Sequence, residues 1–211
     1  MMCQRVIVAI SVVFVLVFST PALAGFAVGP NLFLSLPQED FANVSETGGG
    51  LGVKFLFSPP LLSTIAVRAD FAVAFYGSET YSEEVAGFEV NVETRNESIQ
   101  FTVGPQFQTP MGPVRLYGAP MAGVYNYRTV VELEGTDMDR TESSTTKFGW
   151  SFGGGMLVKV FDNPTGKFNL DIDLGAKYHT IKDAIETEID GLVEKSNAND
   201  ISLHAGVLFS F

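Results

Sequence analysis

Apolar side chains recur at every second position in eight separate runs, and this alternation constrains the fold more than any other feature of the chain. In one run, for example, Val67 and Phe71 alternate with Arg68 and Asp70. The runs lie at residues 26–36, 50–57, 65–75, 99–108, 114–127, 147–160, 168–179 and 201–211. Each is near the length of about 9–11 residues that a tilted strand needs to cross a bilayer.

The spacers between these runs alternate in length. Three short spacers, at residues 58–63, 109–113 and 162–166, all contain proline, as tight turns often do. The longer, polar spacers are residues 37–47, 77–98, 128–146 and 181–200. A lipid-exposed sheet has to close, because every backbone polar group must be paired. The pattern predicts an all-β, closed eight-stranded antiparallel up-and-down transmembrane β-barrel, with short periplasmic turns and long external loops.

The two faces of the predicted strands differ in charge. The less apolar face carries residues of both signs interleaved with glycines, and we expect these as barrel-interior charges: Lys54, Arg68, Asp70, Lys147, Lys159, Asp171, Asp173 and Lys177. Opposite charges can pair inside a narrow barrel, as buried charges require. Aromatic residues near strand ends predict a periplasmic girdle of Phe26, Phe57, Phe107, Phe168 and Phe211 and an outer girdle of Phe75, Trp150 and Tyr178. A soluble lipocalin-like barrel, with its apolar face inward, is the alternative.

The first 24 residues are typical of a secretory signal peptide. Arg5 precedes an apolar run from Val6 to Phe18, and Ala22 and Ala24 fit a cleavage site after Ala24. We therefore expect residues 1–24 to be removed and residues 25–211 to form the barrel domain; a retained anchor is the alternative. The single cysteine would leave with the signal, so the mature chain would have no thiol chemistry. No later apolar run reaches 18 residues, which argues against a helical membrane protein.

Acidic residues outnumber basic ones, and the net charge of −11 argues against nucleic acid as a partner. Two long spacers, residues 77–98 and 128–146, are strongly acidic. Their charges are either solvated surface or a site for cation-bridged lipopolysaccharide or an external partner. Val85, Phe88, Val90 and Val92 lie within the first of these spacers, and we interpret them as a protruding strand pair or a bulge.

Few residues suggest chemistry. Asp173, His179, Ser202 and His204 lie on neighbouring predicted strands and could form the Ser–His–Asp set that acyl transfer uses. All four fall on the face assigned to the interior, whereas outer-membrane barrels that hydrolyse lipids present such residues to the membrane. Two histidines without a further ligand do not make a metal site. We expect no catalytic, cofactor-binding or metal site.

The ending, residues 201–211, keeps alternate positions apolar and ends on an aromatic residue. It resembles the C-terminal signal that the outer-membrane barrel assembly machinery recognises, with Val207, Phe209 and Phe211 as the expected signal positions. The whole chain resembles the small OmpA/OmpX-like barrels of the outer membrane protein β-barrel domain family. That resemblance implies a monomer in the outer membrane of a Gram-negative bacterium, with outer-membrane lipid, lipopolysaccharide and the assembly machinery as partners and no cofactor.

Three functions remain open from the sequence. The first is a non-enzymatic structural or interaction role, either in membrane integrity or in binding and adhesion through the loops. The second is a narrow porin-like channel for small solutes, although charged side chains should nearly block an eight-stranded barrel. The third is a lipid-modifying enzyme.

Overall fold

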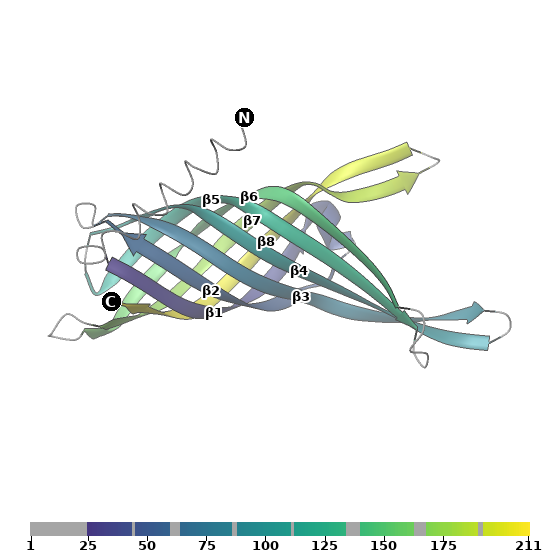
Figure 1. Cartoon of the computed structure of the whole chain (residues 1–211), viewed down its shortest axis with the longest axis horizontal. Helices are drawn as coiled ribbons and strands as arrows, with labels where there is room; N and C mark the ends of the chain where they lie inside the picture. Colours follow the sequence, from purple (N-terminus) through teal and green to yellow (C-terminus); the bar gives the residue numbers. More distant parts are fainter. Residues whose placement is uncertain are drawn as a thin grey trace, which may run out of the picture.

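The computed structural model is a closed antiparallel barrel in which each of the eight strands pairs with its sequence neighbours and β8 returns to pair with β1 (Figure 1). It describes residues 25–43, 45–59, 64–85, 88–110, 112–133, 140–162, 168–189 and 192–211. The strands are β1 (Gly25–Gln38), β2 (Gly48–Ser58), β3 (Ile65–Val85), β4 (Phe88–Gln108), β5 (Val114–Leu133), β6 (Arg140–Asp162), β7 (Asn169–Ile189) and β8 (Leu192–Ser210). The predicted fold class is confirmed, while the predicted signal peptide lies outside the described residues.

The alternation of the sequence becomes an alternation between the inside and the outside of the barrel. On β3, Arg68 is 1% exposed, whereas the nearby Phe71 is 44% exposed. The same contrast recurs on β5, the strand with the least regular pattern: Tyr117 and Tyr125 are buried while Leu116 is exposed. The apolar stripe therefore faces outward, which rules out the lipocalin-like arrangement for these strands.

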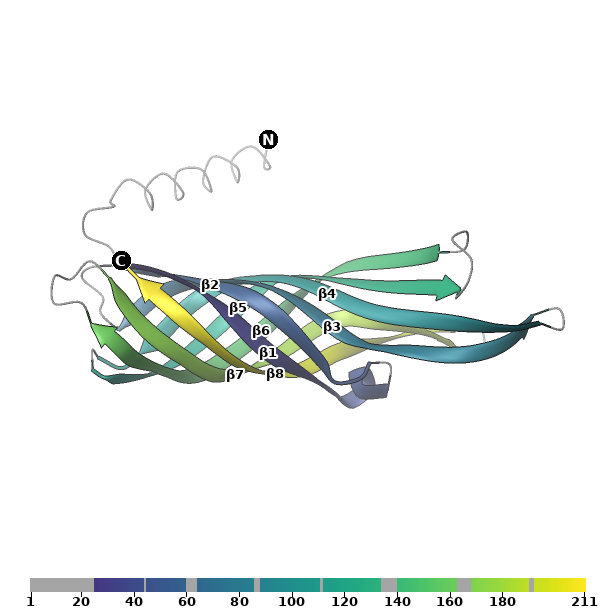
Figure 2. The ribbon, with the colours of Figure 1, turned by 90° about the horizontal axis from the view of Figure 1, so that it is seen from below.

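The two ends of the barrel differ. The short turns, the start of β1 and Phe211 lie at one end, here called the turn end. From the opposite end, here called the extension end, several strands continue well beyond the closed barrel (Figures 1 and 2). β3 and β4 stay paired up to Val85 opposite Phe88, and β7 and β8 up to Ile189 opposite Leu192.

Much of residues 77–98, 128–146 and 181–200 is therefore strand, which corrects the expectation of long loops. The protruding strand pair predicted from the apolar residues of the first spacer is confirmed by the β3–β4 pairing. A register shift falls between Tyr76 and Ser78, and the intervening Gly77 has a φ of 45°. Glycine adopts this left-handed conformation without steric cost, so it permits the bulge at which β3 leaves the barrel.

The closed wall ends where pairing between neighbours stops. β6 and β7 separate after the pair Gly149–Ile181, and β2 and β3 after Gly49–Phe75. This edge of the closed wall is here called the rim. Beyond the rim, β3 to β6 continue as one sheet, and β7 and β8 form a separate ribbon. The link between β1 and β2 contains a short 3-10 helix, η1 (Glu39–Asn43). Among the described residues, no helix is long and apolar enough to cross a membrane.

Candidate functional site in the barrel interior

An ion-pair cluster fills the middle of the barrel. Lys54 on β2 pairs with Asp173 on β7, from across the interior. Asp70 on β3 receives two hydrogen bonds from Arg68 Nε, at 2.9 and 3.0 Å, and one from Lys177 Nζ at 2.5 Å. All five side chains are less than 10% exposed. Because each charge has a partner and the pairs span the interior, the cluster links opposite walls of the barrel.

Tyr117 and His204 extend this cluster. The Tyr117 hydroxyl donates to Asp173 Oδ1 at 2.8 Å and lies 2.9 Å from His204 Nε2. Since the hydroxyl proton is directed at the carboxylate, Nε2 of His204 acts as the donor to Tyr117. A Cβ at Gly175 would lie 2.8 Å from the Tyr117 hydroxyl and 2.9 Å from His204 Nε2. Glycine at this position leaves the space that the Tyr117–His204 contact occupies.

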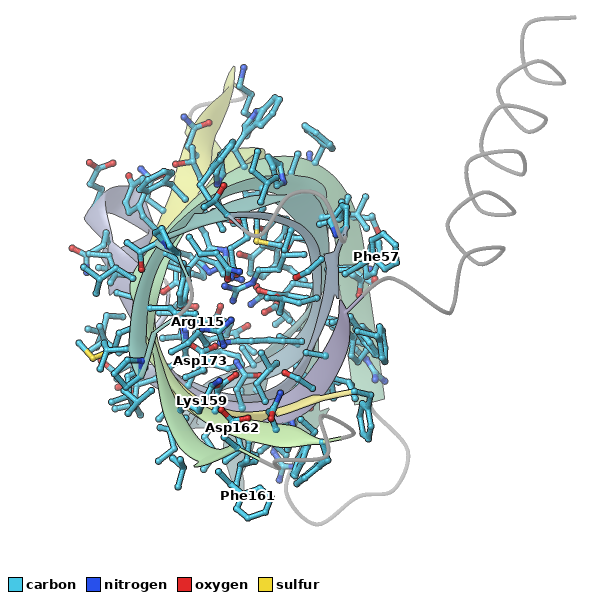
Figure 3. All side chains as sticks on the ribbon, turned by 90° about the vertical axis from the view of Figure 1, so that its left-hand side faces the viewer. Phe57, Arg115, Lys159, Phe161, Asp162 and Asp173 are labelled. Carbon is cyan, nitrogen blue, oxygen red and sulfur yellow. The ribbon has the colours of Figure 1, made fainter. Side chains whose placement is uncertain are left out.

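Other interior charges lie closer to the ends. Asp171 is 1% exposed and accepts a hydrogen bond from Arg115 Nη2 at 2.6 Å. Lys159 is half-buried at the turn end and donates to Asp162 at 3.0 Å, where Figure 3 shows both side chains near the mouth. Lys147 is half-buried on β6, close to the rim. Six of the eight expected interior charges are thus buried in the barrel, while Lys147 and Lys159 lie near its two ends.

The residues considered for acyl transfer do not form one set. Ser202 Oγ lies 3.1 Å from His179 Nε2, and His179 Nδ1 lies 2.9 Å from the Tyr125 hydroxyl. Asp173 instead contacts His204, at 3.6 Å from its Nε2. His179 therefore has a tyrosine where a triad would have its carboxylate. Ser202 and His179 are 6% and 2% exposed and face the interior, away from the apolar outer surface.

Two apolar clusters enclose this polar layer, one toward each end. The cluster at the turn end consists of Ala27, Leu56, Ala66, Tyr117, Leu157 and Leu208. The cluster at the extension end consists of Phe33, Phe41, Ala74, Tyr76, Tyr125, Ile181 and Ala198, with Ala72 and Tyr127 packed against it. Between them lies a space of about 20 Å³, bordered by Lys54, Lys177 and His179 among others. That volume admits about one water molecule.

Phe41 of η1 is a buried side chain at the extension end whose packing was not predicted from the sequence. It is 5% exposed and packs edge-to-face on Tyr76 and Tyr127, with ring centroids 5.5 and 5.7 Å apart. Asn199 of β8 donates to the Glu39 carboxylate at 2.5 Å and holds the same segment. A lone aromatic residue in an otherwise polar spacer was the available signal. The link between β1 and β2 therefore acts as a cap on the extension end.

The charged side chains at the centre of the barrel form ion pairs and hydrogen bonds with one another. Within the part of the chain that the structure describes, no three His, Cys, Asp or Glu side chains converge as metal ligands. At the turn end there is a wider recess of about 420 Å³, lined by Arg115 and Asp171 and bounded on the inside by Leu157 and Leu208. The apolar cluster separates this recess from the central ion pairs.

Comparison with known proteins agrees with this architecture. The sequence profile of the outer membrane protein β-barrel domain family matches residues 10–211. No match is found among curated protein sequences. Among solved structures, Neisserial surface protein A is 16% identical, with a TM-score of 0.53 over 88% of this chain and 97% of that one. Ail, the attachment invasion locus protein of Yersinia pestis, is 16% identical, with a TM-score of 0.47 over 89% and 97%. OprG from Pseudomonas aeruginosa is 10% identical, with a TM-score of 0.43 over 89% and 96%.

Proposed function

Because the chain belongs to the outer membrane protein β-barrel domain family, we propose that it is a non-conducting, non-enzymatic barrel that acts through its extension end as an interaction protein. The outward apolar stripe would contact the lipid of the outer membrane, with the barrel as the anchor. The extension end would face the outside of the cell and the turn end the periplasm, as short turns do in this class of barrel.

The filled interior is the observation that carries this proposal. The lysine, arginine and aspartate side chains at its centre are engaged with one another across the barrel. A space of about 20 Å³ lies beside them, and apolar clusters lie on both sides. A solute path would need continuous water, whereas the described side chains at this level of the barrel are buried ion pairs between two apolar clusters. In planar bilayers we therefore expect no steady conductance, in contrast to the channel alternative.

The non-enzymatic part of the proposal follows from the arrangement of the histidines. His179 and Ser202 are buried in the interior, where an acyl chain in the bilayer has no access. Asp173, the acid that a triad would need, is occupied by Lys54 and Tyr117. A purified sample should therefore release no fatty acid from phospholipid or lipopolysaccharide, and His179→Ala should leave that background unchanged.

The extensions supply the interaction surface. Beyond the bulge at Gly77, β3 continues for eight residues to Val85, which at about 3.3 Å per residue amounts to roughly 25 Å. Strands of this length would project past the lipid surface and can present backbone edges to partners. The acidic sequence of this segment would favour cationic partners or divalent cations.

The test compares the whole chain with a variant in which residues 78–95 are replaced by a short turn. Cells that display each protein are scored for aggregation with one another and for attachment to surfaces. We expect both to fall in the shortened variant, while heat-resistant folding in detergent is kept because the barrel wall is intact. Equal attachment by the two proteins at equal surface levels would overturn the interaction role.

A further inference from the structure

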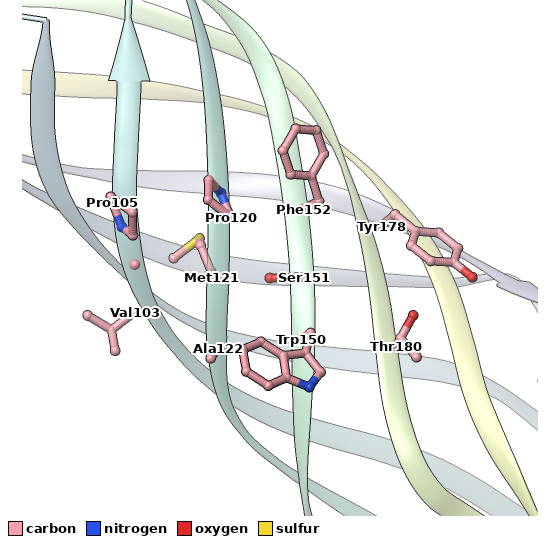
Figure 4. Close-up of a pocket in the computed structure, with 11 residues that line it drawn as sticks. Val103, Pro105, Pro120, Met121, Ala122, Trp150, Ser151, Phe152, Tyr178 and Thr180 are labelled. Carbon is pink, nitrogen blue, oxygen red and sulfur yellow. The ribbon is translucent and has the colours of Figure 1, made fainter.

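An apolar groove runs across the outer wall of the barrel over β4, β5, β6 and β7. It has a volume of about 440 Å³, and Val103, Pro105, Ala122, Trp150, Tyr178 and Thr180 are among its lining residues. Figure 4 shows them in two rows, with Pro105, Phe152 and Tyr178 in one and Val103, Trp150 and Thr180 in the other. The aromatic side chains of β6 form one side of the groove, and the small Ala122 of β5 lies at its base.

The wall is irregular at this place. β4 and β5 are paired at Val103–Ala122 and again at Phe107–Gly118. At the three residues of β4 between these pairs, all of them described, β4 has no paired residue on β5. Pro105 lies opposite Pro120 in this interval. Neither proline has an N–H, so the regular cross-strand bonds cannot form here. The groove thus coincides with a local gap in the backbone hydrogen bonding of the wall.

The groove begins close to the rim. Trp150 pairs with Thr180, and only the pair Gly149–Ile181 lies between them and the point where β6 and β7 separate. Toward β4 the groove reaches Val103 and Pro105, deeper in the wall because strands of a barrel are tilted. The end near the rim carries the Trp150 indole N–H and the hydroxyls of Tyr178 and Thr180, whereas the deep end is apolar. This polarity matches a lipid with its carbonyl groups at the rim and its chain inside the groove.

We propose that the groove binds one acyl chain of lipopolysaccharide, with the sugar-bearing end at the rim and the chain toward Pro105. The outward wall of a transmembrane barrel faces the acyl chains of the membrane, so an acyl chain is the partner that this apolar surface fits. The half of the membrane next to the rim is the outer leaflet, given the orientation proposed above. A chain held in a groove buries more apolar surface than one on a smooth wall, which favours a retained lipid over exchanging neighbours.

The chain contains one tryptophan, so the emission of Trp150 reports on this groove alone. The protein is reconstituted into vesicles of phosphatidylcholine with brominated acyl chains, which quench tryptophan on contact. Unlabelled lipopolysaccharide is then introduced at a small fraction of the acyl chains, and unlabelled phosphatidylcholine at the same fraction is the comparison. We expect lipopolysaccharide to restore several-fold more emission than its share of chains, and phosphatidylcholine to restore only its share.

The variant Ala122→Phe fills the base of the groove, and Ala122→Leu does so with a smaller side chain. Both should reduce the recovery to the proportional value. The matched control Ala205→Phe, on the outward face of β8, should behave like the unchanged protein, because Ala205 is exposed on another part of the wall.

Proportional recovery in the unchanged protein, or unaltered recovery in both Ala122 variants, would overturn the proposal. Equal recovery with phosphatidylcholine would show that the groove takes any acyl chain and would overturn the choice of lipopolysaccharide. Attachment and conductance are measured separately, so a failure here is distinguishable from a failure of the interaction role.

Discussion

The two halves of β3 form one continuous strand but have different sequences. Residues 65–75, in the barrel wall, alternate between buried and more exposed side chains, apart from Ala72 and Val73, which are both half-buried. Residues 78–85, beyond the bulge at Gly77, carry polar residues at both even and odd positions. The lower half separates lipid from a packed interior, whereas the upper half is a ribbon paired on one side with β4. Alternation therefore marks where a strand contacts lipid, and it does not mark where the strand ends.

The largest difference in stability between the two regions is expected at the central ion pairs. Asp70→Asn removes the carboxylate that Arg68 and Lys177 share, and breaking a buried pair in this way costs about 3–5 kcal/mol. The free energy of unfolding in phospholipid vesicles, measured with urea, should fall by that amount. Ser144→Ala on the extension is the matched control and should change it by less than about 0.5 kcal/mol. Similar losses in both variants would mean that the two halves are equally important to folding.

A charge on the outward face should have the next largest effect. Leu174 is exposed in the middle of the apolar face of β7, and Leu174→Arg should destabilise the barrel by about 2–4 kcal/mol. Thr145→Arg, at an exposed position of the β6 extension, should be close to neutral. The same urea titration in vesicles measures both. A neutral Leu174→Arg would place that face outside the hydrocarbon layer.

The cap at the extension end should have a smaller, local effect. Phe41→Ala removes the ring that packs on Tyr76 and Tyr127 and should lower the free energy of unfolding by about 1 kcal/mol. Hydrogen exchange should rise in residues 39–47 and stay slow in the middle of β7, because the ion-pair cluster is untouched. Fast exchange throughout the barrel after this substitution would show that η1 supports the whole interior.

The barrel itself could be predicted from the sequence because eight runs each separate two environments. Lys54 and Asp173 illustrate how far this goes: their strand face was predictable, but their pairing across the barrel was not. They are 119 residues apart in the chain, and only the closed geometry brings β2 and β7 to opposite sides of a narrow interior. Likewise, Tyr117 follows the apolar Leu116 and so falls on the opposite strand face, but nothing in the sequence gave a reason to pair it with His204.

The extensions were underestimated for a different physical reason. Residues 128–146 and 181–200 contain apolar residues, such as Val130, Ile185 and Ile189, but these do not recur at every second position. Such segments give no period-two signal even when their backbones pair. Within residues 77–98, by contrast, Phe88, Val90 and Val92 recur at every second position, and this predicted a strand pair. For Phe41 the only signal was a lone aromatic residue in a polar spacer, and its burial depends on the fold of that short connection. The predicted cleavage after Ala24 and the assembly signal at Val207, Phe209 and Phe211 stay predictions.

Access of water-borne reagents to the interior tests the central claim most directly. Ser202→Cys places a thiol beside His179 between the two apolar clusters, and Ser144→Cys places one on the exposed extension, both in a Cys3→Ser background. A membrane-impermeant thiol reagent should modify the cysteine at 144 rapidly and the one at 202 only after unfolding. Modification of both at similar rates in the folded protein would mean that the barrel holds an open aqueous path, and it would contradict the account.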